Sequence, residues 1–171
     1  MPVPRPAAGD HPPYYDHYVG LVPAGDVLAH LERQLAGSLA LFARIDEPRS
    51  LHRYAEGKWS IKEVVGHLAD VERIHSYRAL RFARGDSTPL PGFEPDDLVA
   101  GAGFDAVPWA ELVEVFRLGR EANLRLWASF SAAAWDRRGE ASGGEFRACA
   151  YPYITAGHEL HHRRVVEEKY L

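Results

Sequence analysis

Hydrophobic residues recur every three or four positions in four separate segments of the chain, which is the spacing of a helix with one buried face. The first segment covers residues 26–45, where Asp26 can cap the start of the helix and Pro48 ends it. Its apolar stripe consists of Leu28, Leu31, Leu35, Leu39, Phe42 and Ile45. The pattern predicts a long amphipathic helix that packs against a core.

The second segment has the clearest start signal. Ser60 and Glu63 have the spacing of a capping box, in which each side chain accepts a hydrogen bond from the backbone N–H of the other residue. The helix is predicted to cover residues 61–84 and to end at Gly85, a length of about 36 Å at about 1.5 Å per residue. Its inward stripe is formed by Ile61, Val64, Leu68, Val71, Ile74 and Phe82, with His67, His75 and Arg78 along its edge.

Two further helices follow in the second half of the chain. The third is expected to begin near Pro108, because the fixed backbone angle of proline suits a first helical turn. After it comes a Gly-rich link, in which residues 142–146 are the one candidate for a small hairpin. The fourth helix is predicted from about residue 148 or 152 to 170. Its inner face carries Ile154, His158, His161 or His162, and Val165.

Four long helices without a convincing strand pattern predict an all-α protein with the architecture of a four-helix bundle. The second and third helices are joined by residues 85–107, a connection of 23 residues that is unusually long for neighbouring helices. An extended chain covers at most about 3.3–3.6 Å per residue, so this connection can return along the whole bundle and leave the two helices parallel. The predicted topology is therefore up-down-down-up.

The chain before the first long helix is too rich in proline and glycine for a helix to be expected there. Aromatic and aliphatic anchors nevertheless occur in it, at Tyr14, Tyr15, Tyr18 and Leu21. We therefore expect residues 1–22 to form an arm packed on the surface of the domain, and residues 23–171 to form the bundle.

Composition narrows the class of protein. The length of 171 residues suits one domain. With 20 Lys and Arg against 24 Asp and Glu, the net charge of −4 argues against general nucleic-acid binding. The single cysteine, Cys149, excludes an intrachain disulfide and a Cys-rich zinc finger. The apolar stretches are too short to span a membrane, and the N-terminus has no secretory signal, so a cytoplasmic protein without a membrane partner is expected.

The last helix contains the histidine cluster GHELHH. Residues four apart lie on one face of a helix, so His158 and His162 can present two imidazoles to one ion. His161 is the competing partner, since it lies three residues after His158. Spacing alone does not choose between them, but the apolar residues Val165 and Val166 favour an inward-facing His162.

Residues 158–162 also satisfy the HExxH pattern of zinc proteases, in which Glu159 would activate a zinc-bound water. That interpretation needs a further ligand downstream. Val165 and Glu168 stand where the extended metzincin pattern needs Gly and His, and only nine residues follow His162. The protease interpretation therefore fails, and a third ligand has to come from upstream.

His67 is the best upstream candidate, because it lies beside the apolar stripe of the second helix. Gly66 precedes it at a cost of about 1 kcal/mol of helix stability, which is understandable if space matters there. Three imidazoles from two helices leave coordination positions open, as in catalytic rather than structural zinc sites. A divalent ion held in this way can lower the pKa of a water or a thiol.

Less specific interpretations accompany these residues. A histidine on an apolar face is more often a hydrogen-bonded core residue than a ligand. Asp70 can orient the ring of His67 or be an exposed helix charge, and Glu159 can be a base near the metal, although solvated glutamates are more common. Cys149 is interpreted as a small core residue. The remaining histidines are interpreted as surface residues or as supports of the ligands: His11, His17, His30, His52 and His75.

Four runs of sequence carry a family resemblance: RYAEGKWSIKEVVGHLADVE, YRALRFARGD, AWDRR and YITAGHELHHRRVV. Together they resemble the DinB-like superfamily, and in particular its metal-dependent hydrolase branch. The resemblance implies a four-helix bundle of up-down-down-up topology, a homodimer, and one zinc or nickel ion bound by His67, His158 and His162. It thus selects His162 over His161.

The resemblance implies more than one chemistry. Some relatives transfer or isomerise with low-molecular-weight thiols, and others are described as hydrolases. We therefore expect a metal-dependent enzyme that activates water or such a thiol against a small-molecule substrate, without assigned catalytic residues. The alternative is a non-catalytic helical dimer that binds a small ligand or a protein partner.

Overall fold

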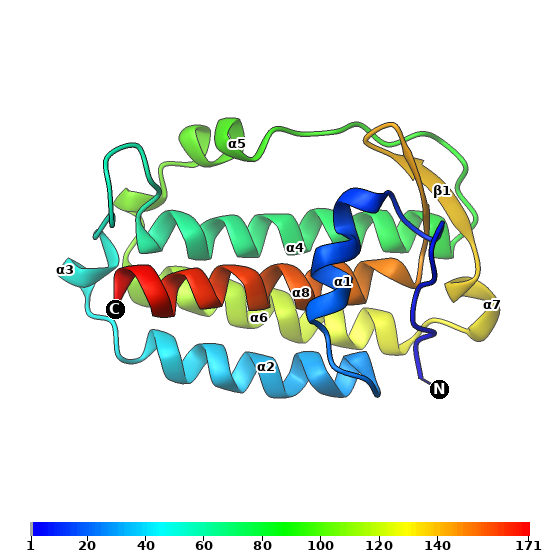
Figure 1. The fold of residues 1–171 in the computed structure, drawn as a ribbon, viewed down its shortest axis with the longest axis horizontal. Coiled ribbons are helices and arrows are strands. Elements are labelled where there is room, and N and C mark those ends of the chain that lie inside the picture. The colour runs from blue at the N-terminus through cyan, green and yellow to red at the C-terminus, as the bar shows by residue number, and fades with distance from the viewer. Residues whose placement is uncertain (1) are drawn as a thin grey trace.

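A computed structural model describes residues 2–171. Four long helices form a bundle (Figure 1), and each of them coincides with one of the predicted amphipathic segments to within a few residues. They are α2 (Val27–Phe42), α4 (Ile61–Ala83), α6 (Trp109–Ala128) and α8 (Ala150–Val165). The last helix continues into a π-helical segment, η3 (Val166–Tyr170). None of the helices in the described part of the chain is long and apolar enough to span a membrane.

The topology is up-down-down-up, as predicted. Figure 1 shows that α2 and α8 run in one direction, whereas α4 and α6 both run in the opposite direction. The connection between α4 and α6 returns along the length of the bundle, and it contains α5 (Pro95–Ala102) and η2 (Phe104–Ala106). These two short helices were not expected from the sequence. Burial of Val99 explains α5, because a short helix depends on packing more than on propensity.

The predicted helix starts are confirmed at residue level. Asp26 accepts a hydrogen bond from the backbone N–H of Leu28. Ser60 and Glu63 make both hydrogen bonds of the capping box. These side chains satisfy N–H groups that the first turn of a helix leaves without partners.

Short elements connect the long helices: α3 (Glu47–Ser50), α7 (Ala132–Trp135), β1 (Arg138–Ala141) and β2 (Gly144–Arg147). The two strands pair antiparallel and form the predicted hairpin, which extends beyond residues 142–146. Ser142 and Gly143 form its turn, with positive φ angles of 53° and 72°. Such angles match the twist of a two-residue hairpin turn.

The N-terminal segment differs from the expectation. It contains η1 (Pro13–Tyr15) and α1 (Asp16–Leu21), although its composition predicted no helix. Packing explains the difference, because α1 lies directly against α8 (Figure 1). A Cβ atom on Gly157 would lie 1.9 Å from the carbonyl oxygen of Tyr18, so only glycine permits this approach. We call residues 2–22 the arm; residue 1 of the predicted range lies outside the described residues.

The core of the bundle has two apolar clusters with charged residues between them. Phe82, Trp127 and Ile154 belong to the first cluster, and Ile61 and Phe116 belong to the second. Buried charged residues from three helices meet between the two clusters: Glu72 on α4, Arg120 on α6 and Glu159 on α8. The bundle is therefore apolar at both ends and charged in the middle.

Candidate metal centre

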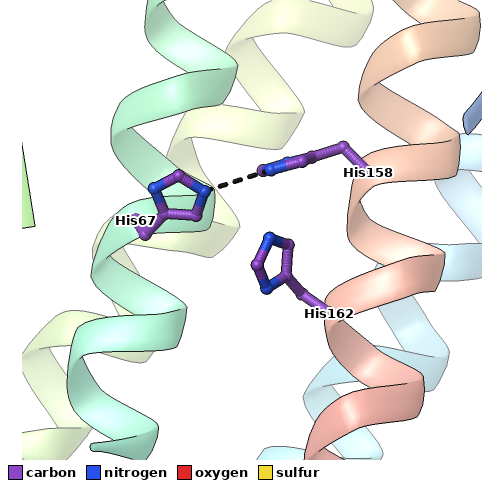
Figure 2. Close-up of side chains that lie close together, drawn as sticks. All are labelled: His67, His158 and His162. Carbon is purple, nitrogen blue, oxygen red and sulfur yellow. Dashed lines mark hydrogen bonds between the residues drawn. The ribbon is translucent and has the colours of Figure 1, made fainter. Parts of the chain in front are cut away.

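The structure brings together the three histidines that the sequence analysis singled out. His67 projects from α4, and His158 and His162 project from successive turns of α8 (Figure 2). The Nε2 atoms of His67 and His158 are 3.1 Å apart and share a hydrogen bond. One ring nitrogen from each histidine lies within 4.8 Å of the other two. We call these residues the histidine triad.

The structure also distinguishes the two neighbouring histidines of α8. The ring of His162 lies 5.0 Å from that of His67, measured between centroids. His161 is exposed, and its ring packs against Tyr18 at 5.8 Å and His17 at 6.3 Å. Only the side chain of His162 therefore faces α4, in agreement with the interpretation from the apolar residues that follow it.

The triad fits a divalent metal ion. Zinc–imidazole distances of about 2.0–2.1 Å in tetrahedral geometry place ligand nitrogens about 3.3 Å apart. The Nε2 atoms of His67 and His158 are close to this spacing at 3.1 Å, and a ring nitrogen of His162 lies within 4.8 Å of both histidines. Burial lowers the pKa of His67 to about 4 and of His162 to about 3, and it holds the pKa of His158 well below its usual value. All three rings are consequently neutral at pH 7, as metal coordination requires. Three imidazoles suit zinc and nickel.

Carboxylates near the triad are few. Asp70 accepts a hydrogen bond from Arg73 on its own helix at 2.9 Å, and among the described residues it accepts none from His67. The negative charge of Asp96 on α5 acts in the opposite direction to burial and favours the protonated form of His67. Sequence reasoning did not single out Asp96, because it lies in the connection that was expected to be a loop.

The space beside Gly66 is occupied by another side chain. A Cβ atom on Gly66 would lie 2.5 Å from ring atoms of Phe104, which belongs to η2. The expectation that space matters at this glycine is therefore correct, but the space serves the packing of the long connection onto α4. This packing also fixes the turn of α4 that carries His67.

The sequence suggested that Glu159 is either a base near the metal or a solvated glutamate, and the structure gives it neither role. Its side chain is buried, and Oε2 accepts a hydrogen bond from Arg120 Nη2 at 2.6 Å, while Ser38 Oγ donates to Oε1. Arg120 also donates from Nε and Nη2 to the carboxylate of Glu72, at 2.6 and 2.8 Å. Glu159 thus points into the bundle core, and it is neither a solvated glutamate nor a base beside the triad.

A cavity of about 220 Å³ opens onto the triad, and aromatic and apolar side chains dominate its walls. Three of its residues come from the arm and two from the long connection. The lining residues are Tyr14, Tyr15, Tyr18, Trp59, His67, Val71, His75, Phe93, Pro95, Ile154, His158, His161 and His162. Within the described chain, no Asp or Glu lines this cavity. The arrangement can therefore bind a small, largely apolar molecule beside a metal ion.

His75 is the cavity residue that sequence reasoning placed least well. It is buried, and its Nδ1 atom lies 3.1 Å from Thr155 Oγ1. Its ring is 6.2 Å from that of His158, so it belongs to the cavity wall and does not join the triad. The sequence did contain a signal for a buried His75: it lies eight residues after His67 on the same helix, close to the inward stripe.

A bundle of this topology with histidines from α4 and α8 defines a recognisable class of protein. The family model of the DinB superfamily matches residues 30–166, and the chain belongs to this superfamily. YfiT from Bacillus subtilis, described as "a probable metal-dependent hydrolase with an unusual four-helix bundle topology", is similar in structure, with a TM-score of 0.65. The match covers 96% of this chain and 92% of YfiT at 12% identity, so it establishes a shared fold. No curated protein sequence matches the chain.

Proposed function

We propose that the protein is a metal-dependent enzyme in which His67, His158 and His162 hold one zinc or nickel ion. The observation that carries the proposal is the convergence of three neutral ring nitrogens within 4.8 Å of one another. Membership of the DinB superfamily and the description of YfiT as "a probable metal-dependent hydrolase" support it. When bound, such an ion has open coordination positions and lowers the pKa of a water or a thiol.

The residues around the triad provide the rest of the site. The aromatic walls bind a small apolar substrate and exclude bulk water, which strengthens electrostatic interactions inside the cavity. The proposed reaction is hydrolysis of a small molecule, or transfer to a low-molecular-weight thiol. A homodimer is proposed with it on the family resemblance, and sedimentation equilibrium of the purified protein tests that assembly.

One observation favours a second candidate function. No carboxylate of the described residues lines the cavity, and Glu159 is directed into the core, so the site lacks a carboxylate base. A helical dimer that binds a small ligand or a protein partner without turnover needs no such base. Assays with esters, amides and thiol–electrophile pairs separate the two functions: turnover that chelators abolish supports the enzyme, and its absence throughout supports the binding protein.

Metal analysis of purified protein tests the ligand assignment. We expect one ion per chain in the wild type and a large loss of bound metal in His67→Ala and His162→Ala, because each variant leaves only two imidazoles. His161→Ala is the matched control, since this neighbouring histidine is exposed and is not one of the residues whose ring nitrogens converge. Unchanged metal content in both triad variants would contradict the assignment.

A further inference from the structure

The outer ring nitrogens of the histidine triad have no hydrogen bonds to the protein. Within residues 2–171, the one side-chain hydrogen bond of the triad joins the Nε2 atoms of His67 and His158. Histidines that bind metals usually donate their second ring N–H to a carboxylate or a carbonyl oxygen, which fixes the direction of the ring. The χ2 torsion of a histidine is broad by itself, so convergent rings need another restraint from the protein.

Trp59 packs against two members of the triad at once. Its ring centroid is 4.7 Å from that of His67, with an angle of 50° between the two planes. The same ring is 6.2 Å from that of His162 and nearly parallel to it, at 14°. Aromatic pairs attract one another at centroid distances of about 4.5–7 Å. An imidazole that turned about χ2 would lose this packing, so the indole restrains one ring of α4 and one ring of α8 together.

Tyr18 makes the corresponding contact with the third member of the triad. Its ring centroid lies 5.3 Å from that of His158, and the planes meet at 80°, an edge-to-face arrangement. Two other histidine rings lie near the triad, His75 at 6.2 Å from His158 and His161 at 5.1 Å from His162. Both of these belong to the ligand helices themselves, α4 and α8. Trp59 and Tyr18 thus provide the aromatic contacts that come from outside these two helices.

The backbone that carries these two aromatic rings is itself held in place. Trp59 directly precedes the capping box that begins at Ser60, and its carbonyl oxygen accepts a hydrogen bond from Tyr170 Oη at 2.7 Å. Tyr18 lies where α1 crosses α8 at Gly157, so closely that a Cβ atom has no room there. A ring restrains its neighbours only if its own position is fixed, and both rings meet this condition.

We infer that Trp59 and Tyr18 are positioning residues, which hold the three imidazoles of the triad in the orientation that binds a metal ion. Their packing takes the place of the hydrogen bonds that usually orient ligand histidines. This inference rests on the proposed function, since it concerns the orientation of the proposed ligands. It adds one residue from the segment before α4 and one residue of the arm to the metal centre, and both act through the imidazoles beside them.

Removal of either aromatic ring tests the inference. We expect Trp59→Leu and Tyr18→Leu each to weaken Zn²⁺ binding about tenfold or more, measured by competition with a chromogenic chelator, as is typical when the support of a ligand histidine is lost. The visible absorption of bound Co²⁺ reports coordination geometry, and it should change in both variants. Trp59→Phe and Tyr18→Phe keep a ring at the same place, so they should retain most of the affinity and the Co²⁺ spectrum of the wild type.

Two results would overturn the inference. The first is wild-type Zn²⁺ affinity in a folded Trp59→Leu or Tyr18→Leu, which would remove the role of that residue. The second is a loss of affinity that follows a loss of stability in urea while the Co²⁺ spectrum stays unchanged, because a merely structural residue behaves in that way.

A control variant separates positioning from the loss of aromatic surface in the cavity. Tyr14 belongs to the same arm and lines the same cavity, but its ring packs against other residues of the arm. Tyr14→Leu should therefore bind Zn²⁺ with the affinity of the wild type. A loss in Tyr14→Leu as large as in Tyr18→Leu would show that the arm acts as a whole, which contradicts the assignment to Tyr18.

Nuclear magnetic resonance of the metal-free protein distinguishes failure of this inference from failure of the proposed function. The order parameters of the ring Cδ2–Hδ2 bonds should fall for His67 and His162 in Trp59→Leu, and for His158 in Tyr18→Leu, but not in the phenylalanine variants. This result together with a wild type that binds no Zn²⁺ would support the positioning role and contradict the metal centre. Unchanged order parameters and unchanged affinity in a wild type that binds Zn²⁺ would contradict the positioning role alone.

Discussion

At the scale of single residues, Arg120 holds two carboxylates of the core together. Its side chain is fully buried and donates hydrogen bonds to Glu72 from α4 and Glu159 from α8. Asn123 and Ser38 donate to these carboxylates as well. The two carboxylates more than compensate the desolvation of the guanidinium, so the pKa of Arg120 is raised despite its burial.

Replacement of Arg120 by methionine should be strongly destabilising, because it leaves two buried carboxylates without a counter-ion. We expect the free energy of unfolding to fall by about 3–5 kcal/mol, measured by urea denaturation at pH 7. Arg117→Met is the matched control on the same helix, where Arg117 pairs with Glu114 and Glu121 near the surface. A loss as large in the control as in Arg120→Met would refute this account of the core.

The sequence correctly predicts the placement of those site residues whose position depends on local spacing along one helix. His158 and His162 share a face because four residues make about one helical turn, and the capping box at Ser60 fixes the start of the helix that carries His67. Glu159 was misplaced because its orientation depends on partners 39 and 121 residues away.

At the scale of elements, the arm is part of the candidate site. Its helix α1 crosses α8 where Gly157 permits close contact, and the ring of Tyr18 lies 5.3 Å from that of His158. Tyr14 and Tyr15 extend the same wall of the cavity. Truncation of the arm would therefore remove one wall of the cavity, although the arm is not one of the four bundle helices.

The variant Gly157→Ala should displace the arm while the bundle stays folded. The new Cβ atom would lie 1.9 Å from a backbone oxygen of α1. A side chain could relieve such a clash by changing its rotamer, but a backbone oxygen can move only if the helix moves. We expect faster amide hydrogen exchange in residues 13–21, and a net stability loss of about 1–3 kcal/mol. Gly20→Ala, with open space around its Cβ position, should leave exchange in the arm unchanged. Equal exchange rates in the two variants would show that α1 does not depend on this contact.

The long elements follow from the sequence, whereas the short ones do not. Periodicity over a dozen or more residues predicted α2, α4, α6 and α8, because each buries one continuous stripe. The helices α1 and α5 have six and eight residues, too few for a helix to be stable by propensity alone. They form because Gly157 and Val99 provide contacts with the bundle, and such contacts appear only in the folded chain.

At the scale of the whole molecule, buried neutral histidines make stability depend on pH. Burial lowers the pKa of His67 to about 4 and of His75 to about 3, and the other triad members shift in the same direction. An unfolded histidine titrates near about 6.5, so below that pH the unfolded state binds more protons than the folded state. The free energy of unfolding is therefore highest above about pH 6.5, and it decreases as the pH falls towards the pKa values of these histidines in the folded state.

Metal-free protein should therefore lose stability steeply in mild acid. Each buried histidine contributes a slope of about 1.4 kcal/mol per pH unit in this window, measured by urea unfolding at about pH 7, 6 and 5. His17→Gln removes an exposed histidine and should leave the slope unchanged. A free energy of unfolding that stays constant from about pH 7 to 5 would contradict the burial of the neutral rings.

The charged residues between the two apolar clusters have a consequence for how the helices align. Ser38, Glu72, Arg120 and Glu159 meet at one level, and each comes from a different helix of the bundle. If any of these helices were shifted along its axis by one turn, about 5.4 Å, an ionised side chain would lose its partner and be buried among apolar residues. These four residues thus fix the axial positions of the helices relative to one another. Because they fix α8 relative to α4, they also keep His158 and His162 opposite His67.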